Sequence, residues 1–211
     1  TSRPGLDLPK NKTITSRTAN MIQILDRNVR RATSLAGTTV ALALVTGALI
    51  TVEAQEADPV DVESIDAIIT AVYDVISGDA GEPRDWSRWN TLFLEEATLS
   101  PTGPTQDGRW GRAIIAPSDY PRRVGSTLER DGFVEAEVHR VTERFGNIAH
   151  VFSTYASFRN RADTEPFQRG INSFQLLYDG TRWWVVSIFW QAETTEYPIP
   201  EKYTGDIGDV K

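Results

Sequence analysis

The sequence contains no cysteine and only two histidines among its 211 residues. Without a thiol, the chain cannot form disulfide scaffolds, cysteine-ligated zinc or iron–sulfur sites, or a cysteine nucleophile. Positive charge is also scarce, because 22 lysines and arginines stand against 29 aspartates and glutamates, a net charge of −7. Nucleic-acid binders need a clustered basic face, so this class is not expected. No G-x-G-x-x-G or G-x-x-x-x-G-K-[ST] motif occurs, and we expect no bound cofactor.

Aromatic residues are missing from the N-terminal part of the chain. All 6 tryptophans, 6 tyrosines and 8 phenylalanines lie at or after Tyr73, so residues 1–54 are not expected to share the core. Three arginines precede the uncharged segment 35–52, and small residues at 52 and 54 fit a signal-peptidase site. We predict a signal peptide over residues 21–54 and an exported, periplasmic or secreted domain. The alternative is an N-terminal anchor formed by residues 35–52. Residues 1–20 are interpreted as a non-native or upstream extension.

Residues 55–192 show the periodicity of one domain that begins with helices. Apolar residues recur at spacings of three and four, which predicts a helix ending at Ser77-Gly78; they are Val62, Ile65, Ile69, Val72 and Ile76. A shorter helix is predicted over residues 86–93, with Asp85 as its N-cap. A third helix is expected over residues 118–131 and is closed by Gly132.

Strands follow the helices. Short strands are expected at residues 97–100 and 109–116, and then the period changes to two over four long strands, 133–145, 147–159, 170–178 and 182–192. A two-residue turn at Gly146-Asn147 would pair Glu143 with His150 and His139 with Thr154. Helices followed by an antiparallel sheet predict the α+β class and exclude a doubly wound dinucleotide-binding fold.

Two segments carry a resemblance to a known superfamily. Residues 93–99 (FLEEATL) enter the first strand, and residues 179–186 (DGTRWWVV) open the last strand. Their order and spacing after the N-terminal helices resemble the nuclear transport factor 2-like (SnoaL-like) superfamily, over about residues 60–192. The resemblance implies a cone-shaped, curved antiparallel sheet wrapped around the helices, with a pocket on its concave side. The superfamily includes ketosteroid isomerases, scytalone dehydratases, polyketide cyclases and members without catalysis, so fold alone does not choose a function.

A steroid-type isomerase site is not expected from this resemblance. Ketosteroid isomerases place an aspartate base shortly after the strand entry and a tyrosine donor on the first helix. Here no carboxylate lies between Glu96 and Asp107. Tyr73 lies two residues after Ala71, the position that would match the isomerase donor.

Two hypotheses about function stay open. In the first, the exported domain binds a small, mostly apolar ligand in the concave pocket, which is lined by Tyr73, Trp89, His139, Tyr155 and Trp184. In the second, the protein is a cofactor-independent lyase, isomerase or cyclase of the SnoaL-like type. His139 is then the general base, and Tyr73 or Tyr155 polarises a carbonyl or hydroxyl group of the substrate.

A metal centre is not expected. It would need three ligands around one point from His139, His150, Glu137 and Glu143, and the two histidines are offset along neighbouring strands. The simpler interpretation is that Glu143 and His150 form an exposed cross-strand pair and that His139 is a partly buried sheet residue.

The last strand suggests how the protein assembles. Strict alternation would place bulky residues on both of its faces, Trp184, Val186, Ile188 and Trp190 on one and Trp183, Val185 and Phe189 on the other. One helical layer covers only one face, so we expect a homodimer through the sheet, and no contact with nucleic acid. Beyond a possible N-terminal anchor, no membrane contact is expected. Residues 193–211 are expected to form an extended tail that folds over a pocket or a neighbouring subunit, or is disordered.

Overall fold

A computed structural model describes residues 56–204 of the chain. The predicted extension at residues 1–20, the signal peptide or anchor at residues 21–54 and the end of the tail at residues 205–211 lie outside the described residues. No helix within the described part is long and apolar enough to cross a membrane.

The helices begin where the sequence provides caps. Helices α2 (Pro59–Val62) and α3 (Ile65–Ile76) are separated by Ser64, whose hydroxyl accepts a hydrogen bond from the backbone N–H of Ala67. The carboxylate of Asp85 caps α4 (Trp86–Thr91) by accepting from the N–H of Arg88, as predicted. A 3-10 turn, η1 (Pro117–Asp119), leads into α5 (Tyr120–Asp131). A second 3-10 turn, η2 (Glu201–Tyr203), lies near the C-terminal end of the described chain.

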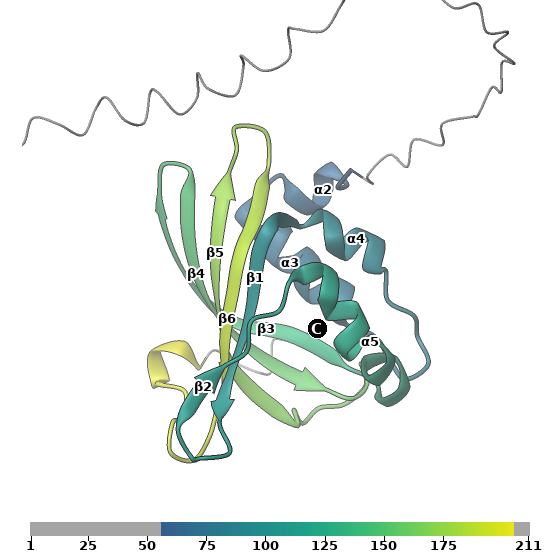
Figure 1. The fold of residues 1–211 in the computed structure, drawn as a ribbon, viewed down its shortest axis with the longest axis vertical. Coiled ribbons are helices and arrows are strands. Elements are labelled where there is room, and N and C mark those ends of the chain that lie inside the picture. Colours follow the sequence, from purple (N-terminus) through teal and green to yellow (C-terminus); the bar gives the residue numbers. More distant parts are fainter. Residues whose placement is uncertain (1–55, 205–211) are drawn as a thin grey trace, which may run out of the picture. The chain divides into compact units, whose positions relative to one another are not determined.

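Six strands form one curved sheet with the order β2-β1-β6-β5-β4-β3. They are β1 (Phe93–Pro104), β2 (Trp110–Arg112), β3 (Val134–Phe145), β4 (Ile148–Phe158), β5 (Gln168–Tyr178) and β6 (Trp183–Ala192). All neighbours pair antiparallel except β1 and β6, which are parallel. Helices α3, α4 and α5 all lie against the concave side of this sheet (Figure 1). The predicted α+β class and curved sheet wrapped around N-terminal helices are confirmed.

The predicted hairpin register is also confirmed. The turn at Gly146-Asn147 places Phe145 opposite Ile148, Glu143 opposite His150, and His139 opposite Thr154. Gly146 has φ 55°, a left-handed conformation that glycine adopts without the clash of a Cβ atom. Gly132 has φ 70° at the end of α5, and a Cβ there would lie 2.2 Å from the carbonyl oxygen of Arg159. This position therefore requires glycine for the chain to turn from α5 into β3.

The alternation predicted for the last strand is wrong beyond its first residues. Leu176 pairs with Val185 and Gln175 with Ser187, so Val186 is the extra residue of a β-bulge. The bulge shifts the phase of the side chains by one residue. Trp183 is only 3% exposed and lies on the same, concave face as the later residues Ile188 and Trp190, whereas Phe189 is 48% exposed on the convex face.

The first two strands differ in length from the prediction. The strand expected at residues 97–100 extends over the whole of β1, because it pairs with β6 on one side and with β2 on the other. The strand expected at residues 109–116 is reduced to β2, with an isolated bridge between Leu99 and Ile115. The second helix ends at Thr91 rather than at Phe93, because Phe93 already pairs with Val185 of β6.

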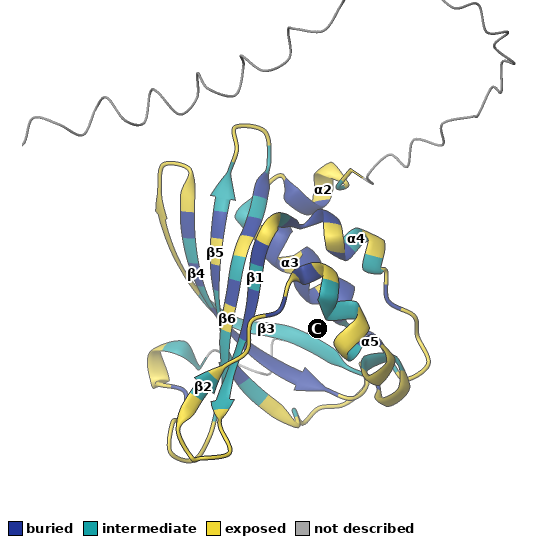
Figure 2. Cartoon of the chain, viewed as in Figure 1, coloured by how far each residue is buried: buried dark blue, intermediate teal, exposed yellow. Residues whose placement is uncertain are grey.

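The core lies between the helices and the concave face of the sheet, where buried residues of α3, α4, β1, β5 and β6 meet (Figure 2). One charged side chain, Arg84, is buried beside this core at 7% exposure. Its guanidinium donates to the carbonyl oxygens of Gly78 at 2.7 Å, Ile76 at 3.0 Å and Leu128 at 3.3 Å. Arg84 therefore holds the end of α3 to α5, and at Gly78 it adds to the hydrogen bond that the same oxygen accepts from the backbone N–H of Phe133 at 2.9 Å.

Candidate functional site

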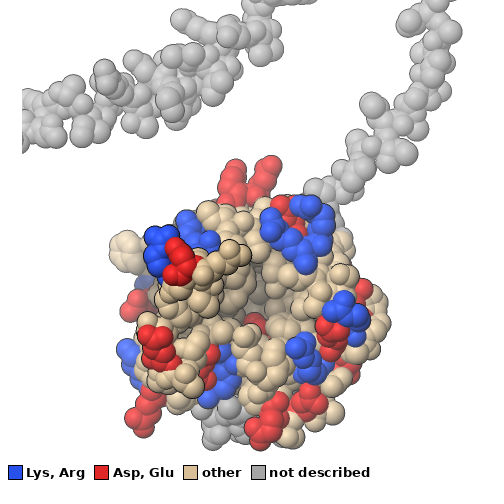
Figure 3. All heavy atoms as spheres, turned by 60° about the horizontal axis from the view of Figure 1, so that its bottom comes forward, with Lys and Arg blue, Asp and Glu red and all other residues tan. Residues whose placement is uncertain are grey.

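A cavity of about 200 Å³ lies between the concave face of the sheet and the helices. Most of its lining is apolar, from Val72 and Ile76 of α3 to Val124 and Leu128 of α5. Six aromatic rings complete it, those of Trp89, Tyr120, Phe133, Tyr155, Phe174 and Trp190. Figure 3 shows a hollow between uncharged side chains on the face that it presents, with acidic atoms visible inside. An apolar cavity with a few convergent polar groups is the usual form of a small-molecule site.

Glu135 provides the carboxyl group of this cavity. It lies on β3, and the carboxylate accepts hydrogen bonds from the Ser157 hydroxyl at 3.0 Å and from the Asn172 amide at 3.3 Å. Burial raises the pKa of Glu135 to about 7, although the two hydrogen bonds act in the opposite direction. A carboxyl group that titrates near neutral pH inside a cavity is a common property of functional sites.

Two tyrosine hydroxyl groups accompany Glu135. Burial raises the pKa of Tyr155 and of Tyr120, and the negative charge of Glu135 adds to both shifts. Neither hydroxyl forms a hydrogen bond with another residue of the described range 56–204. Both hydroxyls are therefore available to a ligand. The ring of Tyr120 stacks on that of Trp89 at 5.2 Å, which fixes one wall of the cavity.

A hydrogen-bonded cluster continues from this cavity towards α3. The Tyr73 hydroxyl lies 2.7 Å from the Ser153 hydroxyl and accepts from the Asn172 amide at 3.0 Å. Ser153 donates in turn to Glu137, which also forms an ion pair with Arg140. Burial raises the pKa of Tyr73 well above its ordinary value. Tyr73 is thus part of a paired network, and it borders a neighbouring cavity of about 660 Å³ rather than the apolar one.

The residues predicted for the site are divided among different places. Trp89 and Tyr155 line the apolar cavity together. Tyr73 is joined to that cavity through Asn172, which lines it and donates to the Tyr73 hydroxyl. Trp184 lies at the hairpin between β5 and β6, where its indole N–H donates to Asp179 at 2.6 Å. The structure therefore brings three of the five predicted residues near one another and separates Trp184 and His139 from them.

Both histidines lie on the convex face. His139 is opposite Thr154, whose hydroxyl donates at 2.7 Å to the backbone oxygen of Tyr203 in the C-terminal segment outside the sheet. His150 contacts the Ser173 hydroxyl at 3.0 Å on the same face. His139 therefore cannot share a substrate with Tyr73 or Tyr155 in the arrangement that the second hypothesis requires. Within residues 56–204, no group of three potential ligands is placed to hold a metal ion.

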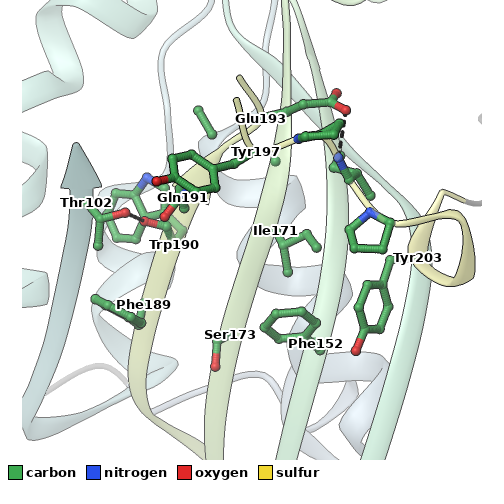
Figure 4. A pocket seen from close by; sticks show the side chains of 15 residues that line it. Thr102, Phe152, Ile171, Ser173, Phe189, Trp190, Gln191, Glu193, Tyr197 and Tyr203 are labelled. Atoms are coloured by element: carbon green, nitrogen blue, oxygen red, sulfur yellow. Dashed lines mark hydrogen bonds between the residues drawn. The ribbon is translucent and has the colours of Figure 1, made fainter. Parts of the chain in front are cut away.

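A third cavity, of about 490 Å³, lies on the convex face (Figure 4). Its floor is formed by Phe152, Ile171 and Phe189 of the sheet, and its cover by Tyr197 and Tyr203 of the C-terminal segment. The C-terminal segment is thus folded over the sheet as far as residue 204. This groove lacks the buried, convergent polar groups that Glu135, Asn172 and Tyr155 provide on the other side.

Sequence analysis missed Glu135, Asn172 and Tyr120. A signal was present, because polar residues occupy inward-facing positions of strands whose period is two: Glu135 on β3 and Asn172 on β5. A polar residue on the face that packs against helices must find a buried partner or face a cavity.

No protein-family model matches the chain, and no curated protein matches its sequence. The chain is similar to solved structures at low identity. One is a protein of unknown function with a cystatin-like fold from Nostoc punctiforme, with 12% identity and a TM-score of 0.48, over 67% of this chain and 97% of that one. Another is a nuclear transport factor 2-like protein of unknown function from Silicibacter pomeroyi, with 13% identity and a TM-score of 0.43, over 62% and 94%.

A third is the beta subunit of a proposed aromatic-ring-hydroxylating dioxygenase from Novosphingobium aromaticivorans, with 15% identity and a TM-score of 0.49, over 65% of this chain and 95% of that one. The architecture itself, helices followed by a curved sheet that wraps around them, is the arrangement that the resemblance to the nuclear transport factor 2-like superfamily implied.

Proposed function

We propose that the protein is an exported binding protein whose concave cavity takes a small, mostly apolar molecule. The observation that carries this proposal is the cavity of about 200 Å³, lined by aliphatic and aromatic side chains, in which Glu135 and two tyrosine hydroxyls provide the polar contacts. Typical ligand pockets measure about 300–1,000 Å³, so the ligand is expected to be no larger than one or two rings.

Calorimetric titration of the full chain with benzyl alcohol tests this proposal. Saturable binding is expected, and Val124→Phe, which adds a ring to the cavity wall on α5, should abolish it. Val141→Phe makes the same change at an exposed position of β3 and serves as the matched control. Absence of binding to the wild-type chain, or equal binding by the two variants, would contradict the proposal.

The alternative enzyme hypothesis loses its general base in this arrangement. A lyase, isomerase or cyclase acting in the concave cavity cannot use His139 or His150, because both lie on the convex face. Export rests on residues 21–54 alone. Expression of the full chain in a bacterial host should yield a periplasmic or secreted product that begins at Gln55, and an uncleaved membrane-bound product would favour the anchor instead.

We propose that the protein forms a homodimer through the convex face of the sheet. Phe145, Ile148 and Phe189 are exposed there, at 84%, 58% and 48%. A second copy related by a two-fold axis would remove this apolar surface from water. Sedimentation at micromolar concentration should give twice the monomer mass, and Phe189→Glu should shift the protein towards the monomer. A wild-type monomer would contradict the proposal.

A further inference from the structure

We propose that the ligand of the concave cavity is an organic cation, a compact ring-bearing amine whose ammonium group contacts the carboxylate of Glu135. This inference rests on the proposed function, since it names the chemical class of ligand for the same cavity. It follows from three observations: a carboxylate without a cationic partner, aromatic walls around it, and neighbouring charged groups that already have ion-pair or hydrogen-bond partners.

The carboxylate of Glu135 has hydrogen-bond donors but no counter-charge. Its two contacts, Ser157 and Asn172, are neutral. Among the ion pairs of residues 56–204, none includes Glu135. A buried carboxylate is costly unless a cation pairs with it, so the ionised form gains most from a ligand that brings a positive charge.

The walls of the cavity suit the same ligand. Faces of aromatic rings attract cations, and desolvated sites strengthen that attraction. Trp89, Tyr120 and Tyr155 line the cavity together with Glu135. The hydroxyls of Tyr120 and Tyr155 accept hydrogen bonds as well as donate them, so they can receive the N–H groups of an ammonium that the carboxylate does not bind. The net charge of −7 also favours the approach of cations over anions.

The other charged groups near Glu135 are already satisfied. On β3, Glu137 is paired with Arg140; on α3, Asp74 is paired with Arg88. In the loop that follows β4, Arg161 is paired with Glu82, and the Asp163 carboxylate accepts from the backbone N–H of Asn160. Tyr73 of α3, Tyr120 of α5 and Tyr155 of β4 have raised pKa values and stay neutral. Glu135 is thus the group whose charge state depends on a ligand.

The rival possibility is a ligand with a carbonyl group, which would accept a hydrogen bond from protonated Glu135. The two ligands differ in their response to pH. An ammonium needs the ionised carboxylate, so its affinity rises as the pH passes upward through the pKa of Glu135, which is about 7. A carbonyl needs the protonated acid, so its affinity falls over the same interval.

Benzylamine, benzyl alcohol and acetophenone separate these outcomes, because they share a phenyl ring and differ in the polar group. Calorimetric titrations of the full chain are compared at about pH 6 and about pH 8, where benzylamine stays protonated. Benzylamine is expected to bind the wild-type chain about tenfold or more tightly than benzyl alcohol at the higher pH, which corresponds to about 1.4 kcal/mol. Its affinity should fall at the lower pH.

Glu135→Gln should remove this preference, so that the variant binds benzylamine no more tightly than benzyl alcohol, and an unchanged circular dichroism spectrum shows that the variant remains folded. Glu143→Gln removes the same charge from an exposed position of β3 and should behave as the wild-type chain. Binding of benzyl alcohol without any preference for benzylamine, or acetophenone binding that weakens as the pH rises while benzylamine gains nothing, overturns the inference alone. If neither benzylamine nor benzyl alcohol binds, the proposed function fails with it.

Discussion

The two faces of the sheet use the same strands for different purposes. On the concave face, helices cover the strands, and the polar groups of Tyr73 and Ser153 are joined in one network with Asn172, which lines the apolar cavity. On the convex face, a short C-terminal segment covers only part of the surface, and Phe145 is 84% exposed. Ligand binding is therefore expected on the covered face, which has a cavity, and contacts with another protein surface are expected on the open face.

The largest change in unfolding free energy is expected at the bulge of β6, where two adjacent valines differ in burial. Val185 is fully buried on the concave side, whereas Val186 is 36% exposed. Val185→Asp places a charge in the core and should cost more than about 4 kcal/mol of unfolding free energy. Val186→Asp should cost less than about 1 kcal/mol. Urea denaturation followed by circular dichroism measures both, and equal losses would mean that the two residues do not differ in burial.

The next largest loss of unfolding free energy is expected when the guanidinium of Arg84 is removed from the concave side. Arg84→Met keeps an unbranched side chain but removes the guanidinium donors to the backbone oxygens of Ile76, Gly78 and Leu128. The expected loss of unfolding free energy is about 3 kcal/mol. Arg122→Met, which removes an exposed arginine from α5, is the matched control and should change little. An unchanged midpoint for Arg84→Met would mean that these oxygens find other donors.

Glu135 makes the stability of the covered face depend on pH. The pKa of its carboxyl is about 7 in the folded protein against an ordinary value of 4.5. Between these values the folded state holds a proton that the unfolded state has released, so stability is fully present below about pH 4.5 and falls as the pH rises towards 7. This group should lower stability by up to about 3 kcal/mol at neutral to alkaline pH.

Glu135→Gln should remove this part of the pH dependence and stabilise the protein at pH values above about 7. Denaturation of both proteins in urea, at a series of pH values, measures the difference. The control is again Glu143→Gln on the convex face, which should keep the wild-type profile. Parallel profiles for the wild-type chain and Glu135→Gln would contradict a raised pKa.

The smallest change in unfolding free energy is expected for substitutions in the C-terminal segment that covers the convex face. Ile199 is 9% exposed there, and its backbone N–H donates to Glu193 at 2.9 Å. Ile199→Ala should cost about 1 kcal/mol, because the segment can partly close over the missing atoms. Lys202→Ala, at an exposed position of the same segment, should cost less. Faster amide hydrogen exchange confined to residues 193–204 would report the local loss, and exchange that quickens throughout the sheet would contradict it.

The elements of the fold were predictable because their signals are local. The spacing of Val62, Ile69 and Ile76 predicts a helix, and the glycine at 146 predicts the turn that sets the register of β3 and β4. The motifs at residues 93–99 and 179–186 were sufficient to predict a curved sheet wrapped around helices. Each of these features depends on residues that are close together in the sequence.

The site was only partly predictable, because it is assembled from distant residues. Trp89 and Tyr155 were identified as aromatic residues of the pocket, but the bulge at Val186 places Trp183 rather than Trp184 inside. His139 lies on the convex face with its predicted partner Thr154, because Thr154 and Tyr155 are adjacent in β4 and point to opposite faces. A β-bulge between Glu137 and His139, which the sequence did not predict, places His139 on the face opposite to Glu135.

The sequence by itself determined the helices, the strand order of the hairpins and the absence of thiol chemistry, since composition and short-range periodicity are enough for these. Only the tertiary structure decided that Glu135 borders the cavity without a cationic partner, because its charge state depends on burial and on Ser157 and Asn172, which come from two other strands. Desolvation is a property of everything packed around a group, and no window of sequence contains it.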